Sequence, residues 1–206
     1  MTLDDISDAI AQHGLVVMGC CANRVLIGTD NGWWDHFVET AEYNDGQCDP
    51  VDRWSKRVLT DLAQRAGARA YFPSDGPPYA PFIAWARQTG RFWQSPTGML
   101  IHDTAGLMIS IRGALELSSP VGDIVQATNP CAGCSDRPCV TACPVGALSD
   151  TQPYEVPACK AFLNTDEGQA CMSSGCLVRQ ACPVSQSFDR PTAQSAFHMG
   201  AFRRTP

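Results

Sequence analysis

The sequence predicts an α+β fold, in which a mixed sheet with packed helices is followed by a small cysteine-rich module. Residues 1–125 alternate continuous apolar runs of strand length with segments of helical periodicity. After residue 125 the long apolar runs end, and eight of the 11 cysteines fall within residues 131–182. We therefore expect three parts: residues 1–125, residues 126–190 and a C-terminal tail, residues 191–206, that packs back.

The chain opens with signals for a helix and two strands. Thr2 precedes Asp5 by three positions, which is the spacing of a capping box at a helix N-terminus. Two continuous apolar runs follow, at residues 15–20 and 24–28, and each has the length of a strand. Because neither run alternates with polar residues, we expect both strands to be buried on both faces.

The longest helix is predicted by signals at both of its ends. Asp49 is a suitable N-cap, Pro50 suits the first helical position, and Gly67 is a common helix terminator. Shorter patterns predict the remaining elements, which in chain order are a helix at 33–43, a strand at 69–72, a helix at 81–89, strands at 99–102 and 107–111, and helices at 138–143 and 155–163.

Composition and charge narrow the functional classes. The formal net charge is −6 and no block of lysine and arginine occurs, so nucleic acid is not an expected partner. No apolar run reaches the ~18 residues that a membrane-spanning helix needs, and the acidic N-terminus does not resemble a secretory signal. We therefore expect a cytoplasmic protein whose thiols stay reduced. In such a compartment, an odd total number of cysteines, most of them closely spaced, favours metal ligation over disulfides.

The spacing of the clustered cysteines carries the strongest chemical signal. The first run has the form C-x2-C-x4-C, in which one tight loop can supply three soft thiolates, and Gly133 permits close approach of the backbone. Proline directly follows Cys143 and Cys182. This arrangement resembles the bacterial two-cluster ferredoxins, so the resemblance implies a ferredoxin-like module with two 4Fe-4S clusters. The alternative is a pair of structural zinc sites, although zinc modules prefer separated C-x2-C knuckles.

In ferredoxins of this kind, the cysteine before proline ligates the other cluster, which divides the eight cysteines into two sets. We expect one cluster on Cys131, Cys134, Cys139 and Cys182, and the other on Cys143, Cys159, Cys171 and Cys176. The remaining cysteines fit buried small side chains and a surface thiol; they are Cys20, Cys21 and Cys48.

Four short motifs outside the cysteine ligands point to a family. They are the strand Gly14–Gly19, the loop Asp75–Pro78, the segment Gly90–His102 and the sequence Pro144–Leu148. Together they resemble epoxyqueuosine reductase, a tRNA-modification enzyme, and its distant relatives the reductive dehalogenases. The likeness is patchy, but it runs through most of the chain in the same order. At residues 95–98 the chain departs from the family, because a lysine-containing loop is replaced there.

The resemblance implies a reductase in which two clusters pass electrons to cobalamin held by the N-terminal domain. It implies Asp75 as the general acid and Trp93, Thr97 and His102 as cofactor contacts. Structural alternatives remain open for three of these residues. Asp75 fits an Asx turn, His102 fits a hydrogen-bonded histidine at a strand end, and Trp93 fits the core.

Two functions therefore remain open. The first is an oxidoreductase, a cobalamin-dependent or otherwise cofactor-dependent reductase that receives electrons from a donor protein such as a flavodoxin or a ferredoxin reductase. The second is a ferredoxin-type electron carrier whose N-terminal domain docks a partner protein. A cavity formed by residues 72–102, large enough for a cofactor or a small-molecule acceptor, is expected of the reductase and not of the carrier.

Overall fold

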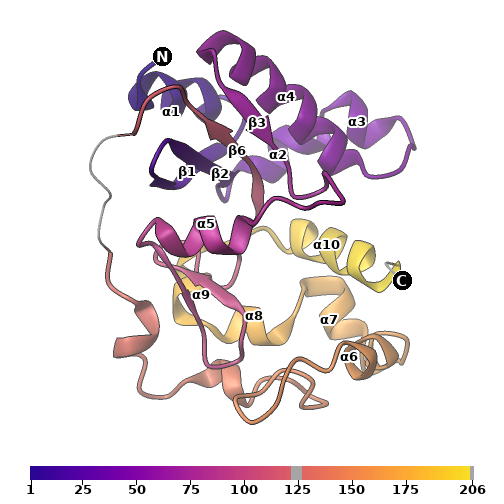
Figure 1. Ribbon diagram of the computed structural model, residues 1–206. Coiled ribbons are helices and arrows are strands. Elements are labelled where there is room, and N and C mark those ends of the chain that lie inside the picture. Colours follow the sequence, from indigo (N-terminus) through magenta and orange to yellow (C-terminus); the bar gives the residue numbers. More distant parts are fainter. Residues whose placement is uncertain (122–126, 205–206) are drawn as a thin grey trace. The chain divides into compact units, whose positions relative to one another are not determined.

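The computed structural model describes residues 1–121 and 127–204, and the chain folds into two compact units (Figure 1). The first, here called the sheet unit, comprises Met1–Phe92 and Ser110–Ala127. The second, here called the cysteine unit, comprises Trp93–Ile109 and Thr128–Pro206. Residues 93–109 thus belong with the clustered cysteines, although we expected them in the N-terminal part. The expected boundary at residue 125 lies outside the described residues.

The sheet unit contains a four-stranded antiparallel sheet, so the α+β class is confirmed but the expected mixed sheet is wrong. The strand order is β1-β2-β6-β3, with bounds Leu15–Cys21, Arg24–Thr29, Ile111–Glu116 and Arg69–Tyr71. Each neighbouring pair runs antiparallel. β1 and β2 form a hairpin, and β6 pairs with β2 on one side and β3 on the other. Strand direction across such long connections depends on tertiary contacts, which an apolar run does not encode.

The strand expected at residues 107–111 is displaced, because the structure places β6 at Ile111–Glu116. Leu107 is buried in the cysteine unit, so its apolar character reflects packing there and not a strand. Within β6, Gly113 leaves no space for a side chain, since a Cβ would lie 2.7 Å from Leu59. A strand interrupted by glycine gives a weak sequence signal, which explains the displacement.

The helices of the sheet unit begin and end largely where local signals predict. They are α1 (Leu3–Ala11), α2 (Trp33–Val38), α3 (Ala41–Asn44), α4 (Pro50–Ala66) and α5 (Phe82–Gln88). The capping box of α1 is confirmed, because Thr2 Oγ1 accepts a hydrogen bond from the Asp5 N–H at 3.2 Å and the Asp5 carboxylate accepts one from the Thr2 N–H at 2.7 Å. Gly67 ends α4 with a φ of 61°. The expected capping by Asp49 is wrong, since its backbone is left-handed and its side chain caps nothing.

Aromatic rings and β2 form the core of the sheet unit. Trp33, Phe37 and Trp54 are buried, and Trp33 stacks on Phe37 with ring centroids 4.5 Å apart. Residues 25–27 of β2 have no exposed surface, which matches the burial expected for this strand. Each buried aromatic side chain removes roughly 150–250 Å² from water. This core contains none of the clustered cysteines.

The cysteine unit consists of a small hairpin and a series of short helices (Figure 1). β4 (Phe92–Gln94) and β5 (Leu100–His102) pair in a two-stranded sheet. The other elements are the 3-10 helices η1 (Pro130–Gly133) and η2 (Pro138–Val140), and α6 (Val156–Phe162), α7 (Gln169–Ser174), α8 (Leu177–Ala181), α9 (Pro183–Phe188) and α10 (Thr192–Arg204). The C-terminal helix α10 packs on α7. Within the described residues, no helix combines the length and apolarity needed to cross a membrane.

The turn after β5 is anchored to the helices on either side of Cys182. Ser185 Oγ of α9 accepts a hydrogen bond from the Leu107 N–H at 2.8 Å. Arg179 of α8 donates a hydrogen bond to the Leu107 carbonyl oxygen. Gly106, with a φ of 57°, lies so close to α9 that a Cβ would be 2.4 Å from the Ser185 nitrogen. These contacts tie the hairpin to the cysteine-bearing helices.

Candidate functional site

Two tight turns position the first cysteines of the cluster. η1 starts at Pro130, and Asn129 Oδ1 accepts a hydrogen bond from the Cys131 N–H at 3.0 Å, which caps the turn. η2 carries the buried Cys139 and follows Arg137, whose φ is 40°. Because both turns are only a few residues long, they fold the run back on itself and allow its thiols to lie near one another.

Four thiols of the cysteine unit, here called the first thiol group, line one small cavity; they are Cys131, Cys134, Cys139 and Cys182. The cavity has a volume of about 50 Å³, and Ile101, Leu107 and Val184 are among its apolar lining residues. Voids larger than a water molecule are rare in protein interiors. These four cysteines are the ones that the spacing assigns to one cluster, and Cys182 joins them from a distant part of the sequence.

The thiols of this group influence one another electrostatically. Burial raises the pKa of the Cys131 thiol, and Cys139, Cys182 and Cys134 raise it further, while Arg137 opposes the shift. Burial likewise raises the pKa of Cys139, with contributions from Cys182 and Cys134. A negative charge on one thiol is unfavourable here, because water is partly excluded and like charges repel. A bound cation reverses this preference and deprotonates the thiols that coordinate it.

The remaining four clustered cysteines, here called the second thiol group, show the same behaviour; they are Cys143, Cys159, Cys171 and Cys176. Cys159 lies on α6 and Cys171 on α7, and burial is the main cause that raises the pKa of both thiols. Cys176 and Cys143 raise both pKa values further, and Cys159 also acts on Cys171. Cys143, Cys159, Cys171 and Cys176 thus form one electrostatically interacting set.

Hydrogen bonds reach two sulfur atoms of the second thiol group. The Tyr154 hydroxyl donates to the Cys159 sulfur, which lowers the pKa of that thiol against the effect of burial. The pKa of Tyr154 is raised, first by burial of its hydroxyl end and then by this bond, although 39% of the residue is exposed. The Leu177 N–H donates to the Cys171 sulfur. Such bonds stabilise thiolates and tune the potential of a cluster that they hold.

The arrangement of the thiols bears on the kind of metal group that they could hold. Among the described residues, no three His, Cys, Asp or Glu side chains are arranged to hold a single metal ion. A structural zinc ion needs four ligands about 2.0–2.3 Å from one point. A four-iron cluster takes its four thiolates on four different irons, so its ligands need not converge on one point.

Asp75, the residue expected to act as a general acid, belongs to the sheet unit. Its side chain is 50% exposed, and Asp75 Oδ1 lies 2.7 Å from Lys56 Nζ. It is not among the lining residues of the two cavities described for the cysteine unit. The structure therefore places Asp75 in a different unit from the other three residues that the resemblance singles out.

Those three residues, Trp93, Thr97 and His102, lie in the cysteine unit but have different surroundings. His102 is buried, and its Nδ1 accepts hydrogen bonds from the N–H groups of Thr104 and Ala105 at 3.3 and 3.2 Å. The imidazole thereby stabilises the turn that follows it in the chain. Trp93 packs against the apolar core of the unit. Thr97 is buried and lines a cavity. The surroundings of His102 and Trp93 fit the structural alternatives stated for them.

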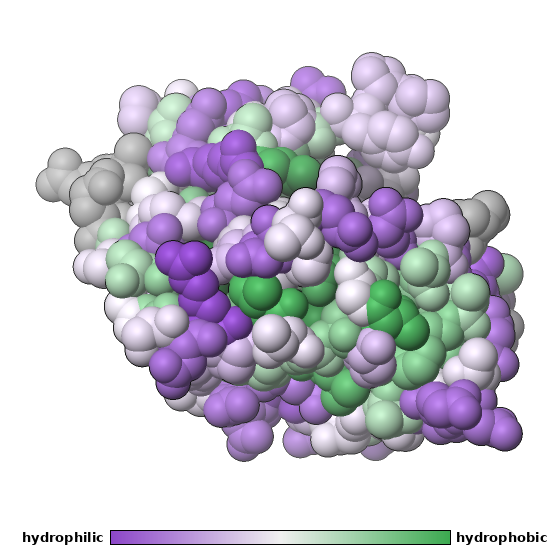
Figure 2. Space-filling model, turned by 90° about the horizontal axis from the view of Figure 1, so that it is seen from below, coloured by the Kyte–Doolittle hydropathy of each residue, from purple (hydrophilic) through white to green (hydrophobic). Residues whose placement is uncertain are grey.

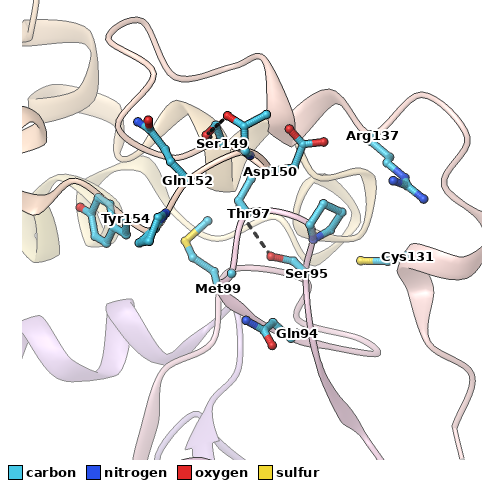
Figure 3. A pocket seen from close by; sticks show the side chains of 14 residues that line it. Gln94, Ser95, Thr97, Met99, Cys131, Arg137, Ser149, Asp150, Gln152 and Tyr154 are labelled. Atoms are coloured by element: carbon cyan, nitrogen blue, oxygen red, sulfur yellow. Dashed lines mark hydrogen bonds between the residues drawn. The ribbon is translucent and has the colours of Figure 1, made fainter.

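A second, polar cavity lies beside the first thiol group (Figure 3). Its volume is about 1210 Å³, and it is lined by residues 94–99, Cys131, Arg137 and residues 149–154. The sequence points to residues 94–99 through the family resemblance, but it offers no signal for Arg137 or for residues 149–154. They reach the cavity only through the fold of the loops around η2 and α6. The face of the molecule drawn in Figure 2 presents both apolar and polar side chains.

No protein-family model, curated protein or solved structure matches the chain. The likeness to epoxyqueuosine reductase and to two-cluster ferredoxins accordingly rests on the quoted motifs and on the cysteine spacing. The function has to be argued from the geometry and chemistry of the two thiol groups and the cavity beside them.

Proposed function

We propose that the chain is an iron–sulfur redox protein whose cysteine unit holds two 4Fe-4S clusters, one on each thiol group. The observation that carries the proposal is that four of the eight thiols line one cavity, while the other four interact electrostatically with one another. Each group includes one cysteine that precedes proline and comes from the other part of the segment, Cys182 in the first and Cys143 in the second. This is the pattern of crossed ligation.

The residues around the thiols fit such a group. Four thiolates form the soft donor set that iron–sulfur clusters require. The raised pKa values of two thiols in each group are what is expected of ligands that a bound cation would deprotonate; these thiols are Cys131, Cys139, Cys159 and Cys171. The apolar lining beside the first group, which includes Ile101 and Leu107, limits the access of water.

When bound, the clusters supply one-electron transfer, and the residues of the chain set its conditions. Ile101 and Leu107 lower the polarity around the first group. The Tyr154 hydroxyl and the Leu177 N–H donate to sulfurs of the second group and stabilise the more negative, reduced state there. The two groups thus have different surroundings, which would give their clusters different potentials.

The electrons are proposed to reach a cofactor or substrate, as in a reductase that resembles epoxyqueuosine reductase. Cobalamin is the cofactor that this resemblance implies, with Asp75 as the acid and Trp93, Thr97 and His102 as contacts. Thr97 is the one of these four residues that lines the polar cavity, so this cavity does not support cobalamin by itself. The alternative is a ferredoxin-type carrier. Co-elution of added hydroxocobalamin with the protein would favour the reductase, and no co-elution would favour the carrier.

Metal analysis of anaerobically purified protein tests the shared premise. We expect about eight iron and about eight sulfide per chain, since each cluster contains four of each. Zinc in place of iron, or much less iron and sulfide in intact protein, would refute the proposal for both candidate functions.

Replacement of a crossed ligand gives the sharper prediction. Cys143→Ala should remove the signal of the cluster on the second thiol group and leave that of the first closer to intact, because Cys143 interacts electrostatically with Cys159 and Cys171. Electron paramagnetic resonance of the reduced variant measures this, with Cys48→Ala as the matched control, since Cys48 is exposed and lies outside both groups. Loss of the first signal instead would refute the crossed assignment.

A further inference from the structure

The polar cavity is built entirely from the cysteine unit, and Cys131 is the one proposed cluster ligand among its lining residues (Figure 3). One wall is the turn between β4 and β5, and another is the segment 149–154. Its volume of about 1210 Å³ exceeds the roughly 300–1,000 Å³ of most small-molecule sites. It is therefore large enough for an organic molecule of several hundred daltons.

The position of the cavity connects it to both thiol groups. Cys131 lines the polar cavity and also the small apolar cavity of the first thiol group. Tyr154 lines the polar cavity as well, and its hydroxyl donates to the Cys159 sulfur of the second group. A molecule bound in the cavity would lie one side chain away from either cluster, which is the arrangement that electron exchange needs.

The lining offers hydrogen bonds more than charge. Ser95 and Thr97 are buried, with their hydroxyl oxygens 3.1 Å apart, and the hydroxyls of Ser149 and Thr151 are 3.2 Å apart. A hydroxyl can donate one hydrogen bond and accept two, so each pair keeps one donor and further acceptor capacity for a ligand. This lining suits a ring or chain with many hydrogen-bonding groups.

Two charged side chains also line the cavity, and Figure 3 draws Asp150 between Thr97 and Arg137. Arg137 is the basic residue and Asp150 the acidic residue among the lining residues. In Figure 3, Arg137 lies at one end of the cavity, Tyr154 at the other, and Thr97 between them. The planar guanidinium of arginine suits a phosphate, with which it forms two parallel hydrogen bonds. An elongated ligand with a phosphate at one end and a polar ring at the other matches this order.

We propose that the polar cavity is the electron-entry site and that it binds free reduced flavin mononucleotide, an inference that rests on the proposed iron–sulfur function. Arg137 binds the phosphate, and the hydroxyl-rich middle binds the ribityl chain and the ring edge. With both clusters in place, the fully reduced flavin would give up two electrons, one for each oxidised cluster, and would release two protons to solvent as it becomes oxidised flavin. A flavin inside a carrier protein would have its phosphate and ribityl chain buried in that protein. Arg137 and the hydroxyls of the cavity could then not bind these groups.

To test the binding step, oxidised flavin mononucleotide and riboflavin are each titrated with the purified protein, and binding is measured by the quenching of flavin fluorescence. We expect the phosphate to improve affinity roughly 10- to 100-fold, the worth of one charge-assisted contact. Arg137→Gln should abolish that difference and leave riboflavin binding unchanged. The proposal would be overturned if neither flavin binds, or if Arg137→Gln prefers flavin mononucleotide over riboflavin as strongly as the parent protein does.

The electron-transfer step is tested by mixing the protein with photoreduced flavin mononucleotide and following the bleaching of the visible cluster absorption. Thr151→Trp fills the cavity and should slow cluster reduction by the flavin at least roughly 10-fold, equivalent to about 1.4 kcal/mol, without slowing reduction by dithionite. Asp166→Trp is the matched control, because Asp166 is exposed and does not line the cavity. An unchanged rate in Thr151→Trp, or reduction only by a flavin held in a carrier protein, would overturn the proposal.

Iron and sulfide analysis of the same samples separates this inference from the proposed function. A cluster-loaded protein that binds no flavin leaves the iron–sulfur function intact and removes only the entry site. A protein without clusters refutes the iron–sulfur function, whatever the flavin measurements show.

Discussion

The side chain of His102 illustrates why a motif match does not by itself assign a role to a residue. A histidine at the end of an apolar strand fits a cofactor contact. In the structure its Nδ1 accepts hydrogen bonds from Thr104 and Ala105, and it thereby holds the turn that leads to Gly106. The same turn is bonded to Ser185 beside Cys182. His102 therefore supports the first thiol group indirectly, through the backbone.

Gly106 is the residue of this turn that is least able to accept a side chain. Gly106→Ala should destabilise the cysteine unit by about 2–4 kcal/mol, because it combines the cost of a left-handed alanine with a clash against the Ser185 backbone. Gly146 is the matched control, since its φ is 64° but nothing lies within 4 Å of its Cβ position, so Gly146→Ala should cost only about 1 kcal/mol. Urea denaturation monitored by loss of cluster absorption measures both. Equal losses would show that the contact with Ser185 is unimportant.

Because the thiol of Cys20 in β1 is partly buried, we expect the free energy of unfolding to depend on pH. Burial raises the pKa of its thiol to about 11, Cys21 contributes in the same direction, and Arg91 opposes it. An unfolded cysteine titrates near 8.5, so the folded state holds its proton more tightly. The resulting stability is complete below about pH 8 and is lost as the pH rises towards 11. Urea titrations of the reduced protein at pH 8 and 10.5, followed by tryptophan fluorescence, should show a smaller loss in Cys20→Ala; an identical loss would contradict this.

Helices were predictable from the sequence because their signals are local. The capping box of α1 and the glycine that ends α4 involve residues within a few positions of one another. The predicted position of β6 was wrong because Leu107 is apolar in order to pack in the core of the cysteine unit and not to form a strand. The predicted strand directions were wrong because pairing between strands that are far apart in the sequence depends on tertiary contacts. Asp49 failed as a cap because its own backbone is left-handed, which residue type does not reveal.

The same distinction separates the two parts of the candidate site. The division of the cysteines into two groups could be stated from the sequence, because the resemblance to two-cluster ferredoxins rests on spacing along the chain and on the positions of proline. The polar cavity could not, because Arg137 and residues 149–154 carry no shared pattern and come together only in the folded unit. Ordinary polar residues become a candidate site through their proximity to Cys131.

The capping box offers a test of how much one local signal contributes to an element. Thr2→Ala should lower the free energy of unfolding of the sheet unit by about 1 kcal/mol, since it leaves the Asp5 N–H without its partner. Thr2→Ser keeps the hydroxyl and should restore most of the loss. Chemical denaturation followed by tryptophan fluorescence reports on this unit through Trp33 and Trp54. Equal stability of the alanine and serine variants would mean that the N-terminus of α1 frays without consequence.

The two units draw their stability from different sources. The sheet unit has a stacked aromatic core and a strand whose residues 25–27 are fully buried, and the clustered cysteines belong to the other unit. The apolar core of the cysteine unit includes two of the proposed ligands, Cys139 and Cys182, among its buried members. If metal binding organises those thiols, the free energy of binding is also free energy of folding for this unit alone.

Loss of the clusters should therefore unfold one unit and spare the other. When iron is removed from the full-length protein by a chelator under reducing conditions, far-ultraviolet circular dichroism should lose the contribution of α6 to α10. The near-ultraviolet signal of Trp33, Phe37 and Trp54 should persist, because that core belongs to the sheet unit and contains none of the eight cysteines. Cys48→Ala, treated in the same way, should behave as the parent protein. Simultaneous loss of both signals would mean that the sheet unit depends on the clusters, and persistence of both would mean that the cysteine unit folds without them.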